Sequence, residues 1–146
     1  MPTLLDPTDR AAMVERLRSL SPSDQAQWGT LDAPRMLCHV SDQLRVALGD
    51  IPATFRGTFL SKSVLKWLVI RTPFQAPPGK VQTVPEMLLT KPAAWSDDLQ
   101  AGVALIDRVG RGDGNAIHPG FGRLSAAEWG ALGWKHLDHH LRQFGH

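Results

Sequence analysis

Apolar residues recur with the spacing of an α-helix in several segments of this chain, and no strand is clearly predicted in any of them. The first helical pattern spans about residues 8–20, with Asp6 or Thr8 as its N-terminal cap. The second begins near Asp32, a good N-cap, tolerates Pro34 in its first turn and ends at Gly49. Two amphipathic helices are therefore predicted in the first third of the chain.

The middle of the chain is predicted to combine two helices with a long irregular connection. Residues 61–71, which contain the most apolar run of the chain at 64–70, fit a helix or a fully buried strand, and the length and the lysine spacing of this segment favour a helix. Residues 72–92 contain five prolines and are predicted to form an irregular crossover. Ser96 is then expected to cap a helix that runs to about Val109.

The last helix, residues 125–144, has the clearest ends. Ser125 and Glu128 have the spacing of a capping box, and Gly145 follows the last turn, where a left-handed residue would close the helix. The whole pattern predicts an all-α fold: one four-helix-bundle domain over residues 1–146, with a long irregular crossover at 72–92.

Composition limits the class of protein without changing this fold. A chain of 146 residues with 42% hydrophobic and 21% charged residues is typical of one globular domain. The net charge of +2 comes from scattered lysines and arginines, which argues against a nucleic-acid surface. A single cysteine, Cys38, excludes an internal disulfide and fits a reducing compartment. No signal peptide and no membrane span are evident, so we expect a cytoplasmic protein.

The candidate chemistry begins with two histidines of the last helix. His136 and His140 are four residues apart, so both imidazoles leave the same helix face and could bind one metal ion. Taken alone, the pair is better explained as partly exposed residues near a helix C-terminus, where cations suit the helix dipole. His39, beside the apolar stripe of the second helix, offers a third imidazole that could face inward. His139, by contrast, lies about 100° from His140 around the helix.

These residues belong to a wider pattern that resembles a known family. It comprises Trp28, Met36-Leu-Cys-His39 with Gln43, Lys80 to Pro85-Glu86, His118-Pro-Gly-Phe-Gly122, Glu128-Trp129, and Lys135-His-Leu-Asp-His-His-Leu-Arg-Gln-Phe-Gly145. The pattern resembles the DinB/YfiT-like metalloenzyme superfamily, and most of all an uncharacterised DinB-like branch classed as a domain of unknown function. The resemblance covers nearly the whole chain, and its C-terminal block is the most specific part.

The resemblance implies a bundle that holds a divalent metal between three histidines, which match His39, His136 and His140 of this chain. With it, the metal site becomes the favoured interpretation. Three neutral imidazoles leave positions for water or substrate, as in catalytic sites. All-nitrogen ligation suits zinc, nickel, copper or iron and does not choose among them. We expect zinc or nickel, with iron or copper as alternatives. The implied function is a metal-dependent hydrolase or a transferase that uses a low-molecular-weight thiol; the alternative is an inactive bundle that serves as a metal-binding or protein-interaction module.

Three further residues are candidates for substrate or acid–base roles. His118 matches the His-Pro loop of the resembled family and is a candidate substrate contact, although a turn or cap role fits it equally well. Gln43 and Asp138 could orient the ligands or exchange protons. We expect a small-molecule substrate, neither a nucleic-acid nor a membrane partner, and a homodimer suggested by the apolar run 64–70 and by the habits of the resembled family.

Overall fold

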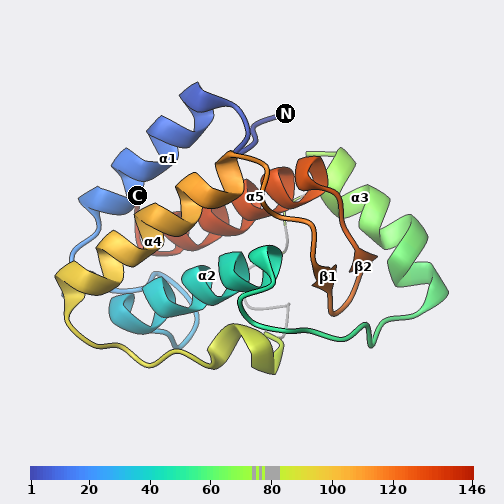
Figure 1. The fold of residues 1–146 in the computed structure, drawn as a ribbon. Coiled ribbons are helices and arrows are strands. Elements are labelled where there is room, and N and C mark those ends of the chain that lie inside the picture. Colours follow the sequence, from blue (N-terminus) through green and yellow to red (C-terminus); the bar gives the residue numbers. More distant parts are fainter. Residues whose placement is uncertain (74, 76, 78–82) are drawn as a thin grey trace.

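The computed structural model describes residues 1–73, 75, 77 and 83–146. This part of the chain is mostly helical (Figure 1), as the all-α prediction requires. Its helices are α1 (Pro7–Ser19), α2 (Ala33–Leu48), α3 (Lys66–Arg71), α4 (Trp95–Gly110) and α5 (Ala126–Gln143), with a π-helical turn η1 (Ser61–Leu65) before α3 and a 3₁₀ turn η2 (Pro85–Leu88) before α4. Two short antiparallel strands, β1 (Ile117–His118) and β2 (Gly122–Arg123), were not predicted.

The helix ends follow the capping residues of the sequence. The Asp6 carboxylate accepts backbone N–H groups at the start of α1, and the Asp32 side chain does the same for α2. Gly49 ends α2 with a φ of 78°, in the left-handed region that favours glycine. Ser125 and Glu128 form the predicted capping box of α5. These caps satisfy N–H groups that have no partner within the helix.

One predicted cap is wrong. Helix α4 begins at Trp95, so Ser96 lies inside the first turn, and its N-cap, Ala94, makes no side-chain hydrogen bond. The carboxylate of Asp98 instead accepts the backbone N–H of Ala93, at 2.8 Å. This bond ties the residue before the N-cap to the first turn without capping an N–H group of the helix, and the negative charge of Asp98 suits the positive end of the helix dipole.

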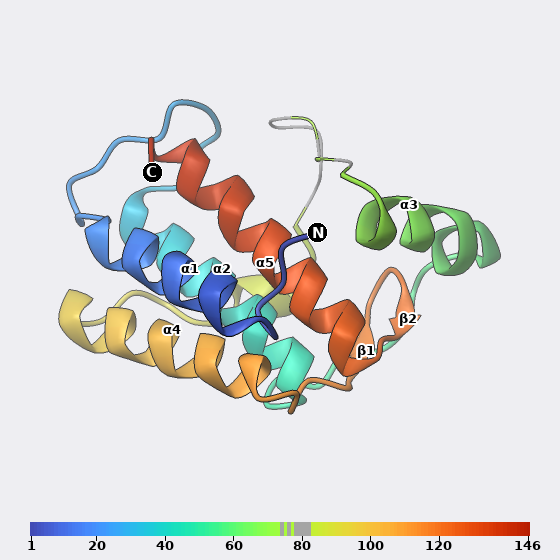
Figure 2. The same cartoon turned by 90° about the horizontal axis from the view of Figure 1, so that it is seen from above.

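Helices α1, α2, α4 and α5 pack against one another around one apolar core (Figures 1 and 2). Helix α2 is the most enclosed of these helices, since most of its residues, polar ones included, are buried. Gly102 of α4 allows a close approach, because an added Cβ would lie 3.4 Å from the Leu37 side chain of α2. Cys38 is buried, as expected for a core residue. Helices α2 and α5, which carry the candidate ligands, also contact each other directly in this core.

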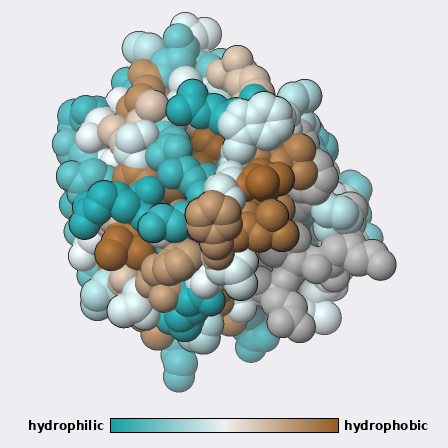
Figure 3. Space-filling view, turned by 90° about the vertical axis from the view of Figure 1, so that its right-hand side faces the viewer, coloured by the Kyte–Doolittle hydropathy of each residue, from teal (hydrophilic) through white to brown (hydrophobic). Residues whose placement is uncertain are grey.

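The segment 61–71, which contains the apolar run 64–70, is helical, and Ile70 is its one buried residue, which excludes the alternative of a buried strand. Ile70 is buried, whereas Phe59, Leu60, Val64 and Trp67 are exposed. Apolar side chains gather on the face of the molecule shown in Figure 3. Polar contacts attach the segment to α5: Lys66 pairs with Glu128 at 2.9 Å, and the Lys135 ammonium donates to the carbonyls of Val69 and Thr72. Self-association through this face stays a prediction.

The connection 72–92 is irregular where it is described, apart from the turn η2. Residues 74, 76 and 78–82 lie outside the described residues, and with them Lys80 of the family pattern. Within the described chain, no helix is both long and apolar enough to cross a membrane.

Candidate metal centre

The structure brings together the three histidines that the family resemblance singled out. His39 comes from α2, and His136 and His140 come from successive turns of α5. Each pair of rings has its centroids 4.7 Å apart, and the ring planes are inclined by 67° to 82°. One nitrogen from each residue lies within 4.8 Å of the other two. The three imidazoles are thus close enough to hold one metal ion.

The protonation of His39 is fixed by a backbone carbonyl. Its Nδ1 lies 2.9 Å from the carbonyl oxygen of Met87, in η2. A carbonyl oxygen only accepts hydrogen bonds, so Nδ1 must carry the proton. In the neutral ring the lone pair is then on Nε2, which faces the other histidines. Metal-binding histidines commonly donate their second N–H to such a carbonyl.

His140 is held in the same tautomer by Gln143. The amide nitrogen of Gln143 donates to the carbonyl of Trp28 at 2.7 Å, which fixes the orientation of the amide. Its oxygen therefore faces His140 Nδ1, at 2.8 Å, and must accept a proton from it. The lone pair of His140 is consequently also on Nε2.

These two tautomers place two lone pairs face to face. The Nε2 atoms of His39 and His140 are 3.1 Å apart. Two acceptors cannot form a hydrogen bond with each other, and their approach is repulsive unless a cation lies near both. Two nitrogens bound at 2.0–2.1 Å to a tetrahedral metal are about 3.3 Å apart, close to the observed separation. The donor set therefore fits a metal ion.

Burial disfavours a proton as that cation. Removal from water lowers the pKa of His39, and it lowers the pKa of His140 to about 3. The pKa of His136 is also well below its usual range, because of burial first and of the neighbouring histidines second. The three rings are thus neutral at physiological pH, the form in which imidazole binds metals. His136 Nδ1 is in addition buried without a hydrogen-bond partner among the described residues.

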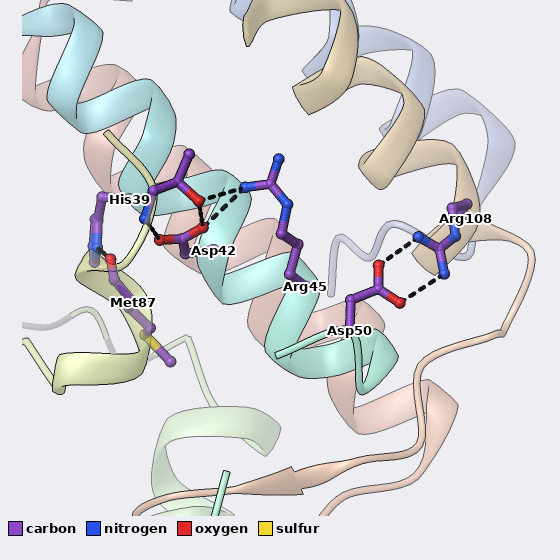
Figure 4. A network of polar contacts seen from close by, with 7 residues as sticks. His39, Asp42, Arg45, Asp50, Met87 and Arg108 are labelled. Atoms are coloured by element: carbon purple, nitrogen blue, oxygen red, sulfur yellow. Dashed lines mark hydrogen bonds and ion pairs between the residues drawn. The ribbon is translucent and has the colours of Figure 1, made fainter. Parts of the chain in front are cut away.

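The chain just after η2, the turn that carries the carbonyl for His39, is anchored to α2 by Asp42 (Figure 4). The buried carboxylate of Asp42 accepts the backbone N–H of Thr90 at 2.8 Å and its hydroxyl at 2.5 Å. Arg45 donates to the same carboxylate at 2.9 Å. Asp42 lies one turn after His39 on the same helix, so one stretch of α2 positions both the ligand and the loop that orients it.

Replacing Asp42 by alanine should therefore lower the free energy of unfolding by about 3 kcal/mol, because several hydrogen bonds to a buried carboxylate are lost. Asp50→Ala is the matched control. Asp50 also pairs with an arginine, Arg108, but both side chains are more than a third exposed, so its loss should cost less than about 1 kcal/mol. Urea unfolding of the two variants tests this. Equal losses would contradict the anchoring role of Asp42.

The three histidines open into a cavity of about 410 Å³. This volume lies in the range of small-molecule sites. None of the described residues that line the cavity is Asp, Glu, Lys or Arg. Its apolar wall is formed by Leu65, Val69, Val84, Met87, Phe121 and Leu132.

The other candidates differ in where they lie. His118 and Gln43 line the cavity, and the side-chain oxygen of Gln43 is buried without a partner among the described residues. Asp138 does not line it, because its carboxylate is taken by Arg16 at 2.8 Å and by Arg142 at 3.0 Å. The structure therefore assigns Asp138 to an ion-pair network between α1 and α5. His139 lies at the cavity but outside the group of three.

Two groups that orient the ligands were not predicted from the sequence: the carbonyl of Met87 and the side chain of Gln143. A backbone carbonyl carries no signal in the residue types. Gln143 did carry one, since it stands three residues after His140 on the same helix, where side chains meet.

Comparison with known proteins agrees with part of the resemblance. The model of one family, described as "Protein of unknown function (DUF1569)", matches residues 2–146. No curated protein and no solved structure matches the chain. The expected likeness to a domain of unknown function is thus confirmed, and since the match spans nearly every residue, the chain belongs to the DUF1569 family of proteins of unknown function.

Proposed function

We propose that this protein is a divalent-metal-dependent enzyme of the DinB/YfiT-like type, with His39, His136 and His140 as the metal ligands and a small molecule as substrate. The observation that carries the proposal is the pair of Nε2 atoms, 3.1 Å apart, both left as acceptors by the carbonyl of Met87 and the amide of Gln143. A buried histidine cluster with no metal role would be expected to pair a donor with an acceptor.

The fold belongs to the same proposal. Helices α1, α2, α4 and α5 pack around one core, as the four helices of a bundle do, and α3 lies to one side with the strand pair (Figure 2). We also propose that residues 1–146 form a single domain and that the protein is cytoplasmic. The ligands come from facing helices in the bundle interior, where bundles commonly build metal sites.

A divalent metal held by three imidazoles would supply a Lewis acid and would lower the pKa of a water or thiol bound beside them. The all-nitrogen donor set suits zinc, nickel, copper or iron, and zinc or nickel is the proposed ion. The chain's own contribution is to keep the Nε2 lone pairs of His39 and His140 pointed at the site. The apolar wall contributes by excluding water, which strengthens the electrostatic interactions inside the site.

The cavity favours hydrolysis of a largely apolar molecule over transfer with a charged thiol. A thiol such as glutathione carries two carboxylates, and the described cavity lining offers no lysine or arginine to bind them. The alternative that remains is a metal-binding bundle without catalytic activity, which the same histidines would serve equally well.

Cobalt substitution separates these functions. Cobalt(II)-loaded protein should contain one ion per chain and show only weak ligand-field absorption, and millimolar glutathione should leave that spectrum unchanged. An intense charge-transfer band on addition of the thiol would show a thiolate ligand and would favour the transferase instead. Failure to load cobalt or zinc at all would contradict the metal site. A metal-loaded protein inactive on a panel of neutral esters and amides would favour the binding module.

A further inference from the structure

His118 is held in one orientation by the residues around it. It ends β1, and its ring stacks on Phe121 with the centroids 4.5 Å apart and the planes inclined by 14°. The ring of Trp129, which is fully buried, also contacts the imidazole, with the two ring centroids 5.5 Å apart. The indole N–H of Trp129 donates to the carbonyl of Ala116, at 3.0 Å, and so ties α5 to the start of β1. The imidazole is therefore part of a packed aromatic group.

The hydrogen bonds of His118 fix its tautomer. Its Nδ1 lies 3.0 Å from the backbone nitrogen of Gly120 and 3.1 Å from that of Phe121. Backbone N–H groups only donate, so Nδ1 accepts both bonds and the proton of the neutral ring is on Nε2. Burial lowers the pKa of His118 to about 4, which keeps the ring neutral at physiological pH.

The Nε2–H group of His118 has no partner among the described residues, and His118 lines the same cavity as the three histidines. Because the turn 118–121 encloses the Nδ1 edge, the Nε2 edge is the one left to face the cavity. This nitrogen is not among the fully enclosed polar atoms that lack a partner, so it reaches solvent, and a substrate oxygen that displaced the water there would accept its proton. The donor is thus free to bind an acceptor in the cavity.

We propose that the Nε2–H group of His118 binds an acceptor oxygen of the substrate, and that the substrate is a small uncharged molecule with an apolar body and a carbonyl-type oxygen. This inference rests on the proposed function for its use of the cavity. The uncharged apolar body follows from the apolar wall and from the lack of charged side chains among the described lining residues. The acceptor oxygen follows from the unpaired donor.

Two substitutions separate the role of the Nε2–H group as a donor to the substrate from the role of Nδ1 as an acceptor within the turn 118–121. In His118→Asn the side-chain oxygen stands as many bonds from Cα as Nδ1 does, so it can still accept the two N–H groups of the turn, while the Nε2–H donor is lost. In His118→Gln the amide nitrogen replaces Nε2 as a donor, and the acceptor for the turn is lost. The amide spectra of Gly120 and Phe121 show whether the turn is kept in the first variant.

The probes are acetophenone and α-methylstyrene, which share one shape and differ in a carbonyl oxygen against a CH₂ group. Both are titrated into the wild-type protein and the Asn variant, and affinities are read from chemical-shift changes of cavity residues. The preference for acetophenone over α-methylstyrene should be about three- to tenfold greater in the wild type than in His118→Asn. His118→Gln should retain the preference. An equal preference in the wild type and the Asn variant, or binding of neither probe, would overturn the proposal.

The test also reads the tautomer directly. Nitrogen-15 NMR of His118 should show protonated Nε2 and unprotonated Nδ1 between pH 5 and 8, and a proton on Nδ1 would refute the assignment. The measurements are made on both metal-free and zinc-loaded protein. A probe preference that appears without zinc supports the role of His118 even if the protein fails to bind metal, so the two proposals can fail separately.

Discussion

Alanine in place of His39, His136 or His140 should reduce the bound metal from one ion per chain to less than about a tenth after dialysis. Each change removes one of three ligands and leaves a pair that chelates weakly. Loss of the hydrogen bond that orients a ligating histidine lowers metal affinity by up to about 100-fold. Loss of the ligand itself should lower the affinity by more than that. Elemental analysis and competition with a chromophoric chelator measure the loss.

His139→Ala is the matched control for these variants. His139 lies at the same cavity and on the same helix as two of the ligands, but it is not one of the three close-set histidines. Its removal should leave the metal content unchanged. Retention of metal by all three ligand variants, or an equal loss in His139→Ala, would contradict the assignment of the ligands.

The sequence predicted the ends of the helices best, because caps act locally. The carboxylates of Asp6 and Asp32 and the capping box of Ser125 each satisfy N–H groups within a few residues. Strands β1 and β2 were missed because two residues are too short to show alternation. Their turn depends on Gly122, whose φ of 74° is a local feature that the glycine-rich sequence around it did not single out.

The candidate site could be predicted only in part, since it joins separate helices. The spacing of His136 and His140 follows from the helix period, whereas the position of His39 against them depends on how α2 packs on α5. Here the family resemblance supplied what the helical pattern alone could not.

The roles of the polar neighbours depended on residues far away in the sequence. Asp138 had the right chemistry to orient a histidine, but Arg16 of α1 and Arg142 take up its carboxylate. Gln143 has that role instead, and the direction of its amide is set by the carbonyl of Trp28, in another part of the chain. Tertiary contacts decide which of these two polar residues orients the histidine, so helical periodicity alone cannot predict it.

Gln143 therefore provides the second large effect that we expect. In Gln143→Leu, His140 loses the acceptor for its Nδ1–H, so the ring is free to turn or to change tautomer and its Nε2 lone pair is no longer held toward the other two ligands. Metal affinity should fall by about 10- to 100-fold. Competition with a chelator measures it, on protein whose metal-free fold is first checked by circular dichroism.

Gln143→Glu separates the orientation of His140 from the loss of the contact with Trp28. Both variants lack the amide nitrogen that donates to the Trp28 carbonyl, so both lose that bond, but only the glutamate keeps an oxygen within reach of His140 Nδ1. The glutamate variant should therefore retain most of the wild-type metal affinity while the leucine variant does not. If the two lost affinity equally, the bond to Trp28 would account for the effect, and Gln143 would stabilise the chain near Trp28 without orienting the metal ligand.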